Sequence, residues 1–304
     1  MTLRWLPRIA LVAVLIASSG WTVYNDDPAS LLPLCHPGGK PSDTPPAEPP
    51  SLTRDACRAR ATSVQRVRVA PLPSGLRSAG SYSHLGATSA GTWSGVLGRI
   101  TVRDPAVRPD TLDFTAARFM ARRDTGEGRT SWLEAGWAET GWSGGGRQRI
   151  YAYDTNRNSW TFFEDYKIHS GDQIWIYLES GPDSGQLATE WRAWLWWGDK
   201  WHLLASQRLP LTSSAQVEQY VEVYSDAKPG SLSGEPPEVR SAPASYSVPP
   251  VSFDNVQVKS APGGAAQFWR ADTVPSTTGD GTAAYCVDWT TRFDTWSAGD
   301  CGRS

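Results

Sequence analysis

Three glutamates lie in stretches of the sequence that read as β-strands. Glu134 stands between bulky apolar neighbours in the run 132–137, where strand alternation puts Leu133 and Glu134 on opposite faces. A glutamate in such a run commonly faces solvent. If its face is instead the concave face of a sandwich, burial raises its pKa and makes Glu134 an acid or base at mildly acidic pH.

The other two glutamates are four residues apart. In the run 217–223, a period of two places Glu218, Tyr220 and Glu222 on one face of a strand, from which both carboxyl groups could reach a site shared with Glu134. A polar strand edge is the alternative. Two carboxyl groups that face one site cannot both ionise at low energetic cost, so they would titrate as a coupled pair and hold one proton at acidic pH.

Other catalytic or metal-binding signatures are weak. The four histidines are far apart and have no metal-ligand spacing: His36, His84, His169 and His202. The run 141–145 matches G-x-S-x-G, but no helix pattern follows it, which favours a flexible hairpin tip. The series Asp154, Asn156 and Asn158 copies half of a calcium loop without its glycine and final glutamate, so we expect a turn there. The sequence predicts no metal and no cofactor.

Composition indicates the elements that position these residues. The chain has 304 residues and a net charge of −2, and only 20% of its residues are charged, which excludes a disordered polyanion and a basic nucleic-acid binder. It has 16 Trp, 28 Gly and 23 Pro against 2 Met, so aromatic mass and turn residues replace the aliphatic composition of helical proteins. A β-rich protein with many loops is expected.

Short alternating runs fill the middle of the chain. From about residue 81 to 258 they are separated by clusters of Gly, Pro, Asp and Asn, as in the runs 99–102, 173–179 and 217–224. This pattern predicts an all-β jelly-roll domain over residues 81–260, built as a two-sheet antiparallel β-sandwich. Long helical periodicity is absent, although residues 116–122 could form one or two helical turns.

The N-terminal region has the pattern of an exported protein. Arg4 and Arg8 precede an uncharged run, 9–24, and small residues at 17–19 suit cleavage, so residues 1–24 are predicted to be a signal peptide. An uncleaved, single-pass membrane anchor is the alternative. Residues 25–80 are a Pro-rich, Arg-containing linker or a propeptide that neutralises an acidic cleft. We expect an extracellular or cell-envelope location.

The four cysteines fit this location and form two separated pairs. The simplest of the three connectivities joins Cys35 to Cys57 and Cys286 to Cys301. The second bond would tie residues 261–304 into a small C-terminal extension.

Six motifs occur in the order found in one group of enzymes. They are GTWSGV at 91–96, LEAGW at 133–137, RIYAY at 149–153, IHSGDQI at 168–174, VEQYVE at 217–222 and PVSFDNV at 250–256. The stretch from about Gly86 to Val258 therefore resembles the glutamic peptidases of the eqolisin and neprosin families. These are secreted enzymes on a concanavalin A-like jelly roll.

This resemblance implies an endopeptidase whose dyad is Glu134 and Glu222. Glu222 would be the base that activates water and Glu134 the acid, with exchanged roles as the alternative, and the optimum would be acidic. Glu218 and Tyr220 would contact the substrate. Trp93 and Trp137 would be walls of the cleft, or core residues. The partner would be a polypeptide substrate, and no nucleic acid is expected to bind. The protein would contact a membrane only through its N-terminal segment, if that segment is not cleaved.

A second cluster favours a different function. Five tryptophans lie within eleven residues: Trp191, Trp194, Trp196, Trp197 and Trp201. Exposed faces of such rings stack on sugars, so a non-catalytic carbohydrate-binding or cell-envelope protein is the alternative to the peptidase. Carboxyl oxygens of Glu134 and Glu222 within about one water's span, on the concave face of an open groove, would favour the peptidase. Separated or solvent-facing glutamates beside an exposed row of Trp would favour the sugar binder.

Overall fold

The computed structural model describes residues 64–67, 80–182, 188–226, 246–279 and 281–302. The predicted export segment 1–24, the predicted linker up to residue 63 and the expected pair Cys35 and Cys57 lie outside the described residues. Within the described part, no α-helix is present, and so none is available that could cross a membrane.

The first sheet has eight strands and carries the glutamates. Its strands are paired antiparallel throughout. In spatial order they are β1 (Val64–Val67), β7 (Ser159–Phe163), β6 (Arg149–Asp154), β5 (Arg129–Thr140), β4 (Phe114–Gly126), β11 (Gln216–Ser225), β2 (Ser81–Ser89) and β14 (Ser276–Gly279).

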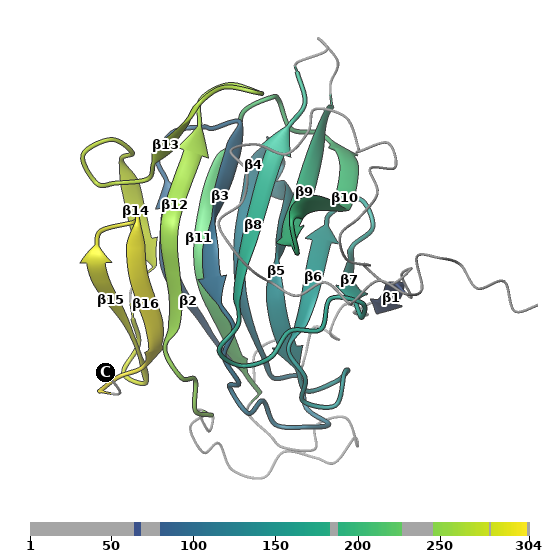
Figure 1. The fold of residues 1–304 in the computed structure, drawn as a ribbon, viewed down its shortest axis with the longest axis vertical. Helices are drawn as coiled ribbons and strands as arrows, with labels where there is room; N and C mark the ends of the chain where they lie inside the picture. The colour runs from purple at the N-terminus through teal and green to yellow at the C-terminus, as the bar shows by residue number, and fades with distance from the viewer. Residues whose placement is uncertain (1–63, 68–79, 183–187, 227–245, 280, 303–304) are drawn as a thin grey trace, which may run out of the picture. The chain divides into compact units, whose positions relative to one another are not determined.

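The second sheet is also antiparallel. Its spatial order is β10 (Lys200–Leu209), β9 (Thr189–Trp197), β8 (Gln173–Ser180), β3 (Gly95–Thr101), β12 (Val251–Lys259), β16 (Thr295–Asp300) and β15 (Tyr285–Thr291), with β13 (Ala266–Phe268) on β12. The sheets lie face to face, with β12 and β8 in front of β11 and β5 in Figure 1. The predicted two-sheet antiparallel sandwich is confirmed.

Strand alternation decides which side chains fill the space between the sheets. On β5, Leu133, Ala135 and Trp137 point into this core, so the residues between them lie on the outer face. The Trp137 Nε1 donates a hydrogen bond to the Thr101 carbonyl oxygen of the opposite sheet at 3.1 Å. A polar indole nitrogen is thus satisfied inside the core.

Residues 116–122 form part of strand β4 rather than helical turns. Ala117, Phe119 and Ala121 belong to the core between the sheets, and Arg118 lies on the outer face with Ala116. Phe119 meets Phe253 of β12 edge-to-face, with ring centroids 5.5 Å apart. The alternation of this run therefore has the period of a strand, and its alanines do not indicate a helix.

The C-terminal segment is part of the sandwich. Strand β14 extends the first sheet beside β2, and β16 pairs with β12 in the second sheet. The predicted Cys286–Cys301 disulfide is confirmed and joins β15 to the end of the chain beyond β16. Trp296 stacks on Phe253, with centroids 4.4 Å apart, and its Nε1 donates to Gln219 Oε1 at 2.6 Å. Gln219 lies on β11 between Glu218 and Tyr220. The C-terminal segment thereby supports the strand that carries two of the candidate site residues.

Replacing this tryptophan should destabilise the whole fold. Trp296→Ala removes a fully buried ring, at a cost of about 3 to 5 kcal/mol, and leaves Gln219 Oε1 without its hydrogen-bond donor. Urea unfolding of the purified chain measures the loss. The half-buried Trp289 is the control, and Trp289→Ala should cost less. Equal losses would show that the tail contributes only general apolar contact.

Candidate active site

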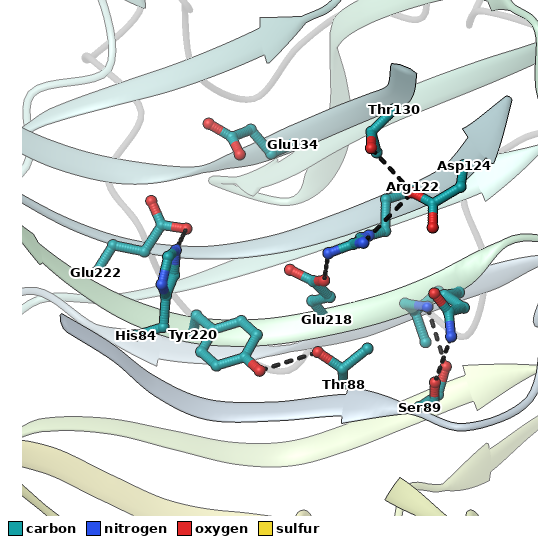
Figure 2. Close-up of polar contacts among 12 residues, drawn as sticks. His84, Thr88, Ser89, Arg122, Asp124, Thr130, Glu134, Glu218, Tyr220 and Glu222 are labelled. Carbon is teal, nitrogen blue, oxygen red and sulfur yellow. Dashed lines mark hydrogen bonds and ion pairs between the residues drawn. The ribbon is translucent and has the colours of Figure 1, made fainter. Parts of the chain in front are cut away.

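The outer face of the first sheet brings three glutamates together. Glu134 comes from β5, and Glu218 and Glu222 come from β11, as Figure 2 shows. Each of the three is at most 6% exposed. Tyr220 lies between the two β11 glutamates and is also buried. The period-two interpretation of residues 217–223 therefore describes this strand correctly.

The register of three neighbouring strands sets the spacing. Met120 of β4 pairs with Glu218 on one side and Glu134 on the other, so these two glutamates share a row across the sheet. In the next row Arg118 pairs with Tyr220 and Gly136. Gly136 is required there because a Cβ would overlap the Ala117 backbone oxygen. Arg118 is therefore on the central strand β4, between β5, which carries Glu134, and β11, which carries Glu218 and Glu222.

Arg118 contacts all three carboxylates. Its Nε is 3.2 Å from Glu134 Oε2, its Nη1 is 3.3 Å from Glu218 Oε2, and its Nη2 donates a short hydrogen bond to Glu222 Oε1. Arg118 is 2% exposed. A guanidinium group has donors on several sides, which lets one residue bridge several carboxylates. The sequence interpretation missed Arg118, although its place in an alternating apolar run marks it as a charged residue on an outer strand face.

Glu222 has further partners on its other side. The Tyr82 hydroxyl donates to Glu222 Oε2 at 3.0 Å, and His84 Nε2 lies 3.5 Å from Glu222 Oε1 (Figure 2 shows the His84 contact). Both residues come from β2, and their rings are in contact, with centroids 4.4 Å apart. The Tyr82 residue is 46% exposed and the His84 side chain 51%. Solvent therefore meets the buried site beside Glu222.

Glu218 and Glu134 have separate partners. Arg122 donates to Glu218 Oε1 at 3.1 Å, so Glu218 is shared between two arginines. The Tyr151 hydroxyl of β6 donates to Glu134 Oε1 at 3.4 Å. Tyr220, in contrast, is hydrogen-bonded to Thr88 at 2.9 Å (Figure 2), and the Arg118 guanidinium lies over its ring. Tyr220 thus helps to hold Arg118 and does not contact a glutamate through its hydroxyl.

These surroundings shift the pKa values of the two predicted catalytic carboxyl groups, Glu134 and Glu222, in opposite directions. Burial raises the pKa of Glu134 above its usual range, which Arg118 opposes without cancelling, and the negative charge of Glu222 adds to the rise. Burial also acts to raise the pKa of Glu222, but Arg118 and His84 outweigh it, and the pKa falls below the usual range. Glu134 is therefore the protonated member and Glu222 the ionised one.

The two predicted tryptophan walls lie elsewhere. Trp137 is fully buried on the opposite face of β5, in the core between the sheets, because it is an odd number of residues from Glu134. Trp93 precedes β3 and packs against the same core. We therefore correct the expectation that these residues line the cleft: Trp137 is a core residue, as the alternative had it, and Trp93 is half-buried against the core.

Aromatic residues of other strands lie on the glutamate face instead. One cluster there contains Ala116, Ala138, Tyr151, Trp160 and Phe162, with Phe114, Trp142 and Tyr153 packed against it. Tyr151 links this cluster to the site through its hydrogen bond to Glu134. No residue of the cluster was selected from the sequence, because its members come from four strands and are near each other only after pairing.

The tryptophan cluster at 191–201 does not form an exposed row. Trp191 and Trp197 are in the core between the sheets, and Trp194, Trp196 and Trp201 are buried in a cluster with Trp175 and Tyr177 on the second sheet's other face. All five are at most 6% exposed. Among the described residues this cluster therefore gives no exposed row of Trp to favour a sugar binder, whereas Glu134 and Glu222 are buried and both contact Arg118.

The remaining sequence motifs are turns. The G-x-S-x-G match lies in the β5–β6 turn, where the Ser143 carbonyl accepts from Thr140 and Arg149. Asp154 caps its own turn by accepting from the Arg157 amide at 2.9 Å, and Asn158 has a left-handed backbone, with φ of 47°. In the described residues, no group of three or more His, Cys, Asp or Glu has a geometry suited to a metal ion.

Solved structures that are similar to this chain include two of one enzyme. Both are of scytalido-glutamic peptidase, one with a peptide-based transition-state analogue and one with a transition-state-analogue inhibitor. Their sequence identities to this chain are 16% and 17% and their TM-scores 0.47 and 0.45, and each match covers 73% of this chain and 99% of the other. They belong to the family that the sequence motifs resemble. At these values the match carries no argument about activity. No protein-family model and no curated protein sequence matches the chain.

The opposite pKa shifts predict opposite effects of two isosteric substitutions on stability. Above about pH 4.3 Glu134 loses its proton in the unfolded chain but keeps it in the folded state. The folded state therefore becomes less stable relative to the unfolded chain as pH rises towards the raised pKa of Glu134. Glutamine keeps the neutral form, so the stability of Glu134→Gln relative to the unmodified chain should increase from about pH 4 to about pH 7.

Glu222→Gln should do the reverse. The ionised Glu222 stabilises the folded state at neutral pH, and this contribution is lost as pH falls through its lowered pKa. The variant should be less stable at about pH 7, with a deficit that shrinks towards about pH 3. Urea unfolding at a series of pH values measures both differences. Parallel curves for the two variants would contradict the assignment of protonation states.

Proposed function

We propose that this protein hydrolyses peptide bonds, with Glu222 as general base and Glu134 as general acid. The observation that carries the proposal is the pair of buried glutamates on one sheet face whose pKa values are shifted apart. A base must be ionised and an acid protonated at the same pH, and these surroundings favour that combination. The motif resemblance to glutamic peptidases supports the same assignment.

The chemistry follows from the two protonation states. Glu222 takes a proton from a water molecule, whose oxygen attacks the peptide carbonyl carbon, while Glu134 gives its proton to the carbonyl oxygen. The tetrahedral intermediate then collapses: the C–N bond breaks as Glu222 returns its proton to the leaving nitrogen, and one hydroxyl group of the intermediate returns a proton to Glu134 as the C=O bond of the new carboxylic acid forms. Arg118 remains charged throughout and orients both carboxyl groups.

The exposed edge formed by Tyr82 and His84 gives substrate and water a route to Glu222. The required state, with Glu222 ionised and Glu134 protonated, extends from acidic towards neutral pH because one pKa is lowered and the other raised. We extend the proposal to location: the chain is exported through residues 1–24 and acts outside the cytoplasm on polypeptides. The Cys286–Cys301 disulfide supports export, since such bonds persist in oxidising compartments.

Cleavage of a denatured protein substrate across the acidic and neutral range tests the activity. The profile of kcat/KM should be bell-shaped, with Glu222 setting the acid limb and Glu134 the basic limb. Glu222→Gln should lower kcat by about 10²- to 10⁴-fold. Glu134→Gln should remove the basic limb, since an amide does not titrate in this range. An absence of cleavage at every pH, or full activity in Glu222→Gln, would disprove the proposal.

Arg118→Lys tests how the base is kept ionised. An ammonium group is a point charge and cannot bridge three carboxylates as the guanidinium does, so the pKa of Glu222 should rise towards its ordinary value. The acid limb of kcat/KM should move to higher pH. Arg122→Lys is the control, because Arg122 lies on the same strand and contacts Glu218 but not Glu222. A merely structural Arg118 would lower the folded fraction and leave the limb unmoved.

A further inference from the structure

A cavity of about 200 Å³ lies where the β5–β6 turn meets the segment after β7. Its lining includes Arg147, Arg149, Glu164, Lys167 and His169. None of these residues has a part in the proposed chemistry at Glu134 and Glu222. The cavity is therefore a second place where charged side chains converge.

Positive charge is in excess in this cavity. Glu164 is the one carboxylate among its lining residues, and three cations share it: Arg147 Nη2 at 3.7 Å, Arg149 Nη1 at 3.4 Å and Lys167 Nζ at 3.8 Å. Three positive charges thus face one negative charge. Such a concave cluster raises the local concentration of anions.

Arg149 is held rigidly in position. Its side chain is 3% exposed, its Nη2 donates to Thr140 Oγ1 and the Ser143 carbonyl, both at 3.0 Å, and its guanidinium lies 3.6 Å from the centre of the Phe162 ring. Gly144 beside it has a positive φ of 89°, which favours glycine, and a Cβ there would overlap the guanidinium. The Arg149 Nε is buried without a hydrogen-bond partner. A buried cation that is incompletely satisfied favours a further anionic partner.

The cavity lies at the margin of the glutamate face. Arg149 pairs in register with Ala138, which is four residues along β5 from Glu134 and on the same face. At about 3.4 Å per strand residue, the separation along the sheet is about 14 Å. An extended peptide covers this length with about four residues.

We propose that this cavity binds a carboxylate of the peptide substrate, about four residues from the bond that is cleaved. Either the C-terminal carboxylate or an Asp or Glu side chain supplies this chemistry. The inference rests on the proposed peptidase function for the identity of the ligand. Bidentate pairing with Arg147 or charge pairing with Lys167 would hold the carboxylate, and Arg149 would set its place.

Peptide binding to the full chain tests this site. Three labelled octapeptides of one apolar sequence are compared: a free acid, its C-terminal amide, and an amide whose last residue is Glu. The Kd is measured on the Glu222→Gln variant, which prevents turnover. The free acid should bind about tenfold more tightly than the plain amide, since a charge-assisted hydrogen bond contributes at least this factor. Tight binding of the Glu-containing amide would identify side-chain recognition in addition.

Charge-reversal substitutions in the cavity test whether its cations cause the preference for the free acid. Arg147 and Lys167 are more than half exposed, so Arg147→Glu with Lys167→Glu should fold and should abolish the preference for the acid. Arg129→Glu, at the far end of β5, is the matched control and should keep it. Equal binding of all three peptides, or a preference for a carboxylate that survives the double substitution, would overturn the inference. Absent cleavage with an intact acid preference would contradict the peptidase proposal alone.

Discussion

The site depends on one buried cation. Three carboxyl groups that are nearly excluded from water lie on a single face of the first sheet, and the Arg118 guanidinium contacts all three and compensates the negative charge that they carry. Removing one partner from a buried ion pair leaves an uncompensated charge, which costs about 3 to 5 kcal/mol. The strand register that places Arg118 between β5 and β11 is therefore a requirement of both stability and chemistry.

The same cation makes the glutamates unequal. Glu222 has Arg118, His84 and Tyr82 as partners, whereas Glu134 has a longer contact to Arg118 and a tyrosine hydroxyl. Burial disfavours the charge on both carboxyl groups, and only Glu222 has enough positive neighbours to overcome it. Two identical side chains thus acquire different protonation states from their surroundings, and this difference is what general acid–base chemistry needs.

The sandwich supports this face from behind. Strand β11 carries Glu218 and Glu222 outward and Gln219 inward, where Gln219 binds Trp296 and the Phe293 carbonyl of the C-terminal segment. The interior contacts of one strand therefore fix the site on its other side. The segment after residue 260, which reads as an appendage, completes the edges of both sheets and is part of the framework that holds the glutamates.

The sequence by itself determined the all-β class and the shared face of Glu218, Tyr220 and Glu222, because period-two alternation is a local property. It favoured the Cys286–Cys301 pair as the simplest of three connectivities, and the structure decided it. It did not determine which face of each strand is interior. Trp137 and Glu134 are three residues apart, and only packing against the second sheet assigns one to the core and the other to the site. Arg118 and His84 become partners of Glu222 only through strand pairing. Burial and ion pairing depend on residues distant in the chain, so the tertiary structure decided them.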